Sequence, residues 1–168
     1  MSAGQSGPMI LIIGVRDDFS HVYGNEQELL ADGGFCAEAG GRFGALEFFD
    51  SEGYRLAGTY DENWRLLGLT RTAECDDERV LQRVQDSLKQ LRCYIESHSQ
   101  EFTSLSMTME DALLSLPDLD GMSDLAMCMT TLKNCFGHSG QRSADGEIGQ
   151  LETQGFVDGV CHVTGWCR

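Results

Sequence analysis

The fold is decided by residues 45–70, ALEFFDSEGYRLAGTYDENWRLLGLT. Three runs rich in apolar and aromatic residues, 45–49, 54–60 and 64–70, are separated here by two short polar turns. Such runs at even spacing, joined by short loops, predict three consecutive antiparallel strands. Gly53 in the first turn and Asn63 in the second are the residues best suited to a positive φ.

The sequence before this meander predicts a buried strand and one short helix. Met9–Val15 is a continuous β-branched run, typical of a strand that is buried on both faces. Asn25 followed by Glu28 resembles a helix-capping pair. Glycines at the start of 33–44 would end that helix, and we expect the rest of this range to be a flexible loop.

The sequence after the meander predicts a long amphipathic helix over about 77–98. Apolar residues recur at helical spacing there and form one stripe that we expect to cover the sheet: Val80, Leu81, Val84, Leu88, Leu91 and Ile95. Two shorter helices are expected beside it. One runs over 109–116 with Thr108 as its cap, and the other runs over 124–135 with Ser123 as its cap.

These elements predict an α+β fold: an antiparallel sheet of about four to five strands, covered by the long helix and the shorter ones. A chain of 168 residues has the size of one domain. We therefore expect a single domain over 1–168, with a loose N-terminus at 1–8 and an exposed loop at 137–150. A further strand is expected within 156–166, where Val157, Cys161 and Val163 share one side.

The charge of the chain excludes some classes of partner. The formal net charge is −15 and the isoelectric point is about 4.4, which disfavours binding to nucleic acid and to anionic membranes. The apolar run at 9–15 is too short to span a membrane, and no secretion signal is recognisable. Seven cysteines, an odd number without such a signal, indicate free thiols in a reducing cytoplasm.

No basic residue occurs between Arg92 and Lys133, a stretch that holds seven carboxylates and five of the seven methionines. Methionine suits adaptable binding surfaces as well as core gaps, and unopposed negative charge suits a basic or amphipathic partner. We expect Met129 to pack in the core with Leu125 and Leu132. The predicted partner-binding residues are Met107, Met109, Glu110, Asp111, Met122, Asp124 and Met127.

The function hypothesis is therefore an acidic, non-enzymatic cytoplasmic binding module: an adaptor, an inhibitor or a chaperone-like accessory factor. A homodimer formed through an open sheet edge is a further option. The main alternative is a metal- or thiol-dependent protein with a zinc site, because thiolates and imidazoles near the C-terminus would suit zinc if they converged: Cys135, His138, Cys161, His162 and Cys167.

Other chemistries have less support in the sequence. Residues 118–129 fail the calcium-loop pattern because the glycine stands at position four and the last position is Met129. Met127, Cys128 and Met129 would point in different directions on a helix, so they cannot jointly bind copper. A small enzyme of unknown class is the second alternative, but no nucleophile or phosphate-binding motif supports it.

Overall fold

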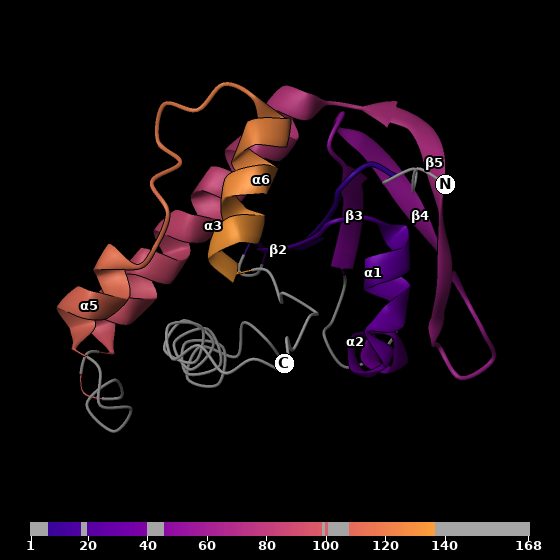
Figure 1. The fold of residues 1–168 in the computed structure, drawn as a ribbon, viewed down its shortest axis with the longest axis horizontal. Coiled ribbons are helices and arrows are strands. Elements are labelled where there is room, and N and C mark those ends of the chain that lie inside the picture. Colours follow the sequence, from indigo (N-terminus) through magenta and orange to yellow (C-terminus); the bar gives the residue numbers. More distant parts are fainter. Residues whose placement is uncertain (1–6, 18–19, 40–45, 99, 101–107, 137–168) are drawn as a thin grey trace, which may run out of the picture.

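The computed structural model describes residues 7–17, 20–39, 46–98, 100 and 108–136. In this part of the chain, five antiparallel strands form one sheet in the order β2-β1-β3-β4-β5 (Figure 1). The strands are β1 (Ile10–Gly14), β2 (Ser20–Tyr23), β3 (Leu46–Asp50), β4 (Tyr54–Tyr60) and β5 (Leu66–Cys75). The helices are α1 (Glu26–Ala31), α2 (Gly33–Glu38), α3 (Asp77–Ser97), α5 (Met109–Leu114) and α6 (Leu125–Phe136). The protein therefore belongs to the α+β class, as the sequence predicts.

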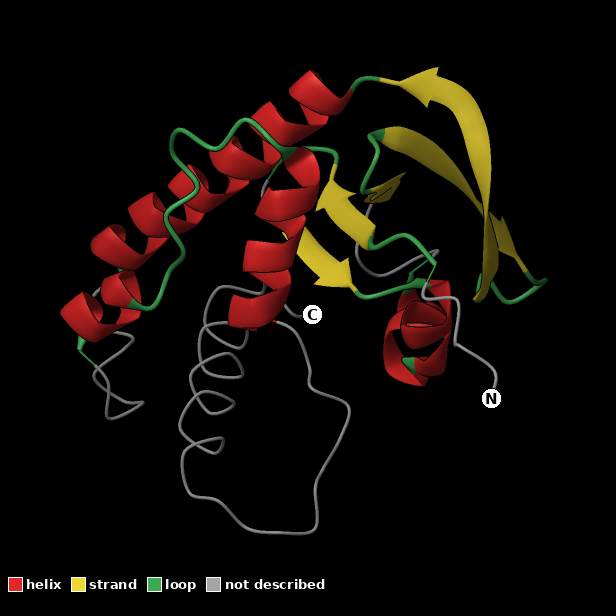
Figure 2. Ribbon diagram, turned by 45° about the horizontal axis from the view of Figure 1, so that its top comes forward, coloured by secondary structure: helices red, strands yellow, loops and turns green. Residues whose placement is uncertain are grey.

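Two apolar clusters lie on opposite faces of the sheet. Leu11 and Ile13 of β1 belong to the cluster beneath α3, α5 and α6, whereas Ile10 and Ile12 belong to the cluster beneath α1 and α2. Alternate side chains of a strand point to opposite faces, so a continuous apolar run suits a strand covered on both sides. Figures 1 and 2 show the two groups of helices on either side of the sheet.

Helix α3 packs on the sheet through the apolar stripe that the sequence shows. All six residues of that stripe are buried. The Asp76 carboxylate accepts a hydrogen bond from the Arg79 amide and caps the first turn. Ser87 is also fully buried; its hydroxyl lies 2.9 Å from that of Ser20 in β2 and donates to the carbonyl of Val84. The helix therefore contacts the sheet through one polar pair as well as through apolar side chains.

The structure corrects three details of the sequence prediction. Residues 33–38, predicted as loop, form α2, whose first turn is capped by the Asp32 carboxylate accepting from the Phe35 amide at 2.9 Å. Strand β2 was not predicted. The third strand of the meander begins at Leu66 rather than residue 64 and continues to Cys75 rather than residue 70. The strand expected within 156–166 and the loop expected at 137–150 lie outside the described residues.

The two turns of the meander differ in how well they match expectation. Gly53 has a φ of 85°, as predicted, and a Cβ atom there would come within 2.6 Å of the Asp77 backbone. In the second turn the left-handed residue is Trp64, with a φ of 62°, and not Asn63. Glycine at the first turn is required by both conformation and space, whereas tryptophan at the second is unfavourable.

Candidate functional site

The helical region from α5 to α6 exposes the three predicted partner-binding carboxylates, Glu110, Asp111 and Asp124. Lys133 is the one base within 108–136. Five acidic side chains lie at the surface of this region: Glu110, Asp111, Asp118, Asp120 and Asp124. The Lys133 ammonium lies 3.2 Å from the Glu28 carboxylate at the start of α1. The positive charge of α6 is thus directed toward α1, and the α5–α6 region keeps an excess of negative charge.

Three of these carboxylates also hold the local backbone. Asp111 completes a capping box with Thr108 at the start of α5, as the sequence predicts for Thr108. Asp118 accepts from the Asp120 amide at 3.0 Å in the connecting turn. Asp124 accepts from the Met127 amide at 2.7 Å, so Asp124, and not the predicted Ser123, caps α6. These acids fix the chain while leaving their charge at the surface.

The methionines of this region differ in their exposure. Met129 is fully buried with Leu125 and Leu132, as expected. Met109 and Met122 are half-buried and pack against the core cluster beneath α3. Met127 is 60% exposed, and Leu114 on α5 is 78% exposed. Met107 lies outside the described residues. The apolar side chains that α5 and α6 offer to a partner are therefore chiefly Met127 and Leu114.

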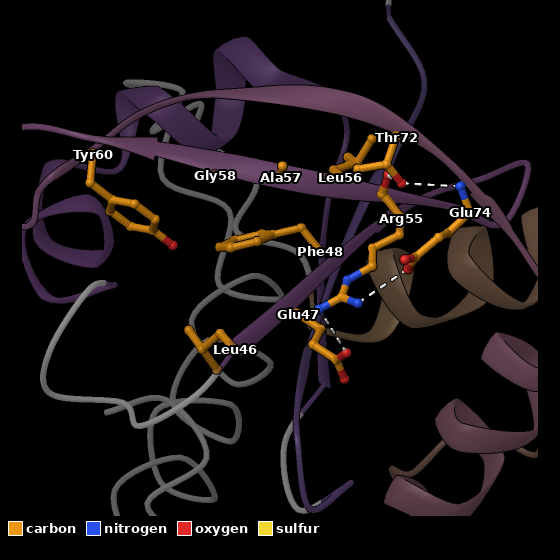
Figure 3. Close-up of a pocket in the computed structure, with 10 residues that line it drawn as sticks. All are labelled: Leu46, Glu47, Phe48, Arg55, Leu56, Ala57, Gly58, Tyr60, Thr72 and Glu74. Atoms are coloured by element: carbon orange, nitrogen blue, oxygen red, sulfur yellow. Dashed lines mark hydrogen bonds and ion pairs between the residues drawn. The ribbon is translucent and has the colours of Figure 1, made fainter.

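A second feature is a pocket of about 340 Å³ where β3 and β4 separate. The two strands pair through Phe48 with Leu56 and Phe49 with Arg55, and they diverge beyond these pairs. Figure 3 shows β3 running obliquely away from β4, with Phe48, Leu46 and Tyr60 around the opening. The lining is apolar at one end and polar at the other, and the small volume suits one side chain or a small ligand better than a large cofactor.

The polar end of this pocket is already neutralised internally. Arg55 lies 3.5 Å from Glu47 and 3.2 Å from Glu74 (Figure 3). Glu47 in turn lies 2.7 Å from Arg83 of α3, which also pairs with Asp17 at 2.7 Å. Burial alone would lower the pKa of Arg83, but its hydrogen bonds to these two carboxylates raise it. The guanidinium therefore stays charged, and the alternating charges hold α3, β3 and β4 together.

The tip of the β4–β5 hairpin is a third feature. Trp64 is 65% exposed and adopts the left-handed φ of 62°, which costs a bulky residue about 1–3 kcal/mol. Its ring lies near that of Tyr60, with centroids 6.4 Å apart and an angle of 50° between the planes. The sequence pattern does not predict this site, because Asn63 is the residue of the turn that most readily takes a positive φ. The signal that was available is the lack of glycine in a turn between two strands.

Burial makes three of the described thiols less reactive. All five described cysteines are free, and burial raises the pKa of Cys128 to about 11 and also raises the pKa of Cys36 and Cys135. A thiol whose pKa is raised is a poor nucleophile at neutral pH. Tyr23 is similar: burial, together with its hydrogen bond to Asp32 at 2.8 Å, raises the pKa of the phenol.

The alternative metal site is untested by the described part of the chain. Cys135 is half-buried on α6 and packs against the core, while His138, Cys161, His162 and Cys167 lie outside the described residues. Among the residues that are described, no three Cys, His, Asp or Glu side chains gather in a way that would hold a metal ion.

The outer edge of β5 bears on the possibility of a homodimer. Its pairing with β4 is irregular in two places, and the Leu69 amide donates to the Glu26 carboxylate of α1 at 2.7 Å. Bulges and edge groups that are already bonded make a strand a poor template for pairing with a second chain. The β5 edge is thus irregular and partly bonded, and a homodimer formed through a sheet edge stays a prediction.

The comparisons with known proteins do not assign this chain to a family. No described helix is both long enough and apolar enough to cross a membrane. No family model matches the chain, and neither a curated protein nor a solved structure matches it.

Proposed function

We propose that this protein is an acidic, non-enzymatic cytoplasmic binding module, acting as an adaptor, inhibitor or chaperone-like accessory factor for a basic, amphipathic protein partner. The observation that carries the proposal is the α5–α6 surface, defined here as Leu114 and Met127 with the five exposed carboxylates between residues 110 and 124. Exposed apolar side chains in a segment that is rich in exposed carboxylates suit a partner that is apolar on one face and basic around it.

The net charge of −15 supports the same class of partner. An excess of negative charge speeds the approach of a basic chain and repels an acidic one. Free thiols at all five described cysteines fit a reducing compartment. The half-buried state of Met109 and Met122 narrows the proposed contact to fewer methionines than the sequence suggested.

The test is the binding of a fluorescently labelled helical peptide with lysines on one face and leucines on the other. We expect Kd to rise with salt between about 50 and about 500 mM NaCl, because the Debye length shortens. Met127→Lys is expected to raise Kd roughly three- to tenfold, because it removes an apolar contact and adds a repulsive charge.

Val15→Lys is the matched control, because Val15 is 54% exposed but lies in the turn after β1, outside the α5–α6 surface. It makes the same charge change to the whole protein and is expected to alter Kd less than about twofold. Equal effects of the two variants would show that only net charge matters. Failure of the wild type to bind the peptide at low salt would refute the proposal.

A further inference from the structure

The backbone at the tip of the β4–β5 hairpin is held by one carboxylate. Asp61 accepts from the Asn63 amide at 2.8 Å and from the Arg65 amide at 2.9 Å. Its own amide donates to the Arg65 carbonyl, and the Trp64 amide donates to the Asp61 carbonyl. Four hydrogen bonds within five residues make this a fixed loop, and its shape places residue 64 at a positive φ.

Tryptophan is an unfavourable choice for that position. Glycine would adopt the same φ without strain, and asparagine would do so at low cost. The side chain does not recover the cost by burial, since it is 65% exposed. Strain at a residue that contributes little to the core is characteristic of a site that serves binding.

Tyr60 lies beside Trp64 and gives the site a second aromatic ring. The two ring centroids are 6.4 Å apart and the planes are inclined by 50°. Tyr60 itself is fixed, because its ring lies over Gly58, where an added Cβ atom would come within 2.8 Å of the Tyr60 hydroxyl. A cation within about 6 Å of a ring centroid is attracted by the negative face of the ring.

The charges around the tip favour a cation. Asp61 and Glu62 lie in the same turn, and Glu62 is exposed. The nearest base in sequence, Arg65, reaches across to α2, where its guanidinium lies 3.7 Å from the position that a Cβ atom on Gly33 would occupy. Arg65 also lies close enough to Cys36 to lower the pKa of that thiol against the effect of burial. The turn therefore carries two acids beside its aromatic pair, while Arg65 is directed toward α2.

We propose that Trp64 and Tyr60 form an aromatic clamp for an arginine side chain of a basic protein partner, with Asp61 and Glu62 supplying the negative charge. This inference rests on the proposed function, because the same basic partner is bound, and it adds a second contact far along the chain from the α5–α6 surface. Arginine fits better than lysine because its planar guanidinium stacks on an aromatic face.

The test uses the full chain with the Trp166→Phe substitution, so that all tryptophan fluorescence comes from Trp64. An arginine-rich peptide is added, and a matched peptide carries citrulline, which keeps the shape and loses the charge. We expect the arginine peptide to change the Trp64 fluorescence and the citrulline peptide to bind roughly tenfold more weakly.

Substitution at the clamp separates binding from stability, with affinity followed by anisotropy of a labelled arginine peptide. Trp64→Gly is expected to raise Tm by a few degrees, because strain is relieved, and to raise Kd about five- to tenfold. Trp64→Phe is expected to retain part of the affinity, since phenylalanine is a weaker cation acceptor. Asn63→Gly changes the neighbouring residue and is the control, with Kd unchanged.

The possible outcomes distinguish this clamp from the α5–α6 surface. Loss of affinity for the arginine peptide in Trp64→Gly supports the clamp, with or without a loss in Met127→Lys. Loss in Met127→Lys with none in Trp64→Gly overturns the clamp and leaves the proposed function standing. Equal affinity for the arginine and citrulline peptides also overturns it. Absence of binding to any basic peptide refutes both.

Discussion

Asp50 shows how a single buried charge is stabilised in this protein. Its side chain is fully buried at the end of β3, where Oδ1 accepts from the amides of Glu52 and Tyr54 and Oδ2 forms an ion pair with Arg71. Arg71 also lies over the Tyr54 ring. A buried carboxylate without such partners would be strongly unfavourable, so the β3–β4 turn and β5 are joined through this one residue.

Asp50→Asn is therefore expected to reduce the free energy of unfolding by about 2 kcal/mol, because the amide cannot form the ion pair and directs a donor toward Arg71. Urea denaturation measures the change. Glu52→Gln is the matched control, since Glu52 pairs with the same guanidinium at 2.8 Å but is exposed. That variant is expected to lose less than about 1 kcal/mol. A loss as large for Glu52→Gln would show that burial of Asp50 is not what makes it important.

Among the helices and strands, the sequence predicts well those that carry a long periodic pattern of apolar residues. It predicts poorly those that are short or whose residues also favour a competing structure. The apolar stripe of α3 and the apolar run of β1 are strong signals, because many residues in each follow the same pattern. Strand β2, with only Ser20–Tyr23, is too short to show a pattern. Helix α2 begins with two glycines, which favour a loop unless a cap such as Asp32 and packing of Cys36 select the helix.

The features of the candidate site are likewise predicted only in part. The acids of α5 and α6 and the burial of Met129 follow from sequence patterns, whereas the divergence of β3 from β4 and the strain at Trp64 do not. Those two features arise where strands stop pairing regularly, and pairing depends on residues distant in the sequence. Local propensity carries no information about such contacts.

Helix α6 offers a pair of methionines that differ mainly in environment. Met129 is fully buried against the sheet, whereas Met127 is 60% exposed. Met129→Ala is expected to lower the free energy of unfolding by about 2–4 kcal/mol, because it removes apolar burial and leaves a cavity. Met127→Ala is expected to change it by less than about 0.5 kcal/mol. Thermal or urea denaturation of the two variants gives the comparison, and similar losses would contradict this orientation of α6.

For the molecule as a whole, thiol burial predicts a dependence of stability on alkaline pH. Burial raises the pKa of Cys128 from 9.0 to about 11 in the folded state. The stability that this thiol contributes is fully present below pH 9. Between about pH 9 and 11 the unfolded thiol loses its proton while the folded one keeps it, so the free energy of unfolding falls by about 1.4 kcal/mol per pH unit.

Cys128→Ala is expected to flatten this slope by about one proton, measured by urea denaturation in reducing buffer from about pH 8 to about pH 11. Cys36, Cys135 and Tyr23 have raised pKa values too, so part of the slope remains in that variant. Cys93→Ala is the control for the loss of a thiol as such, because Cys93 is at an exposed position on α3. An unchanged slope in Cys128→Ala would show that this thiol does not couple folding to pH.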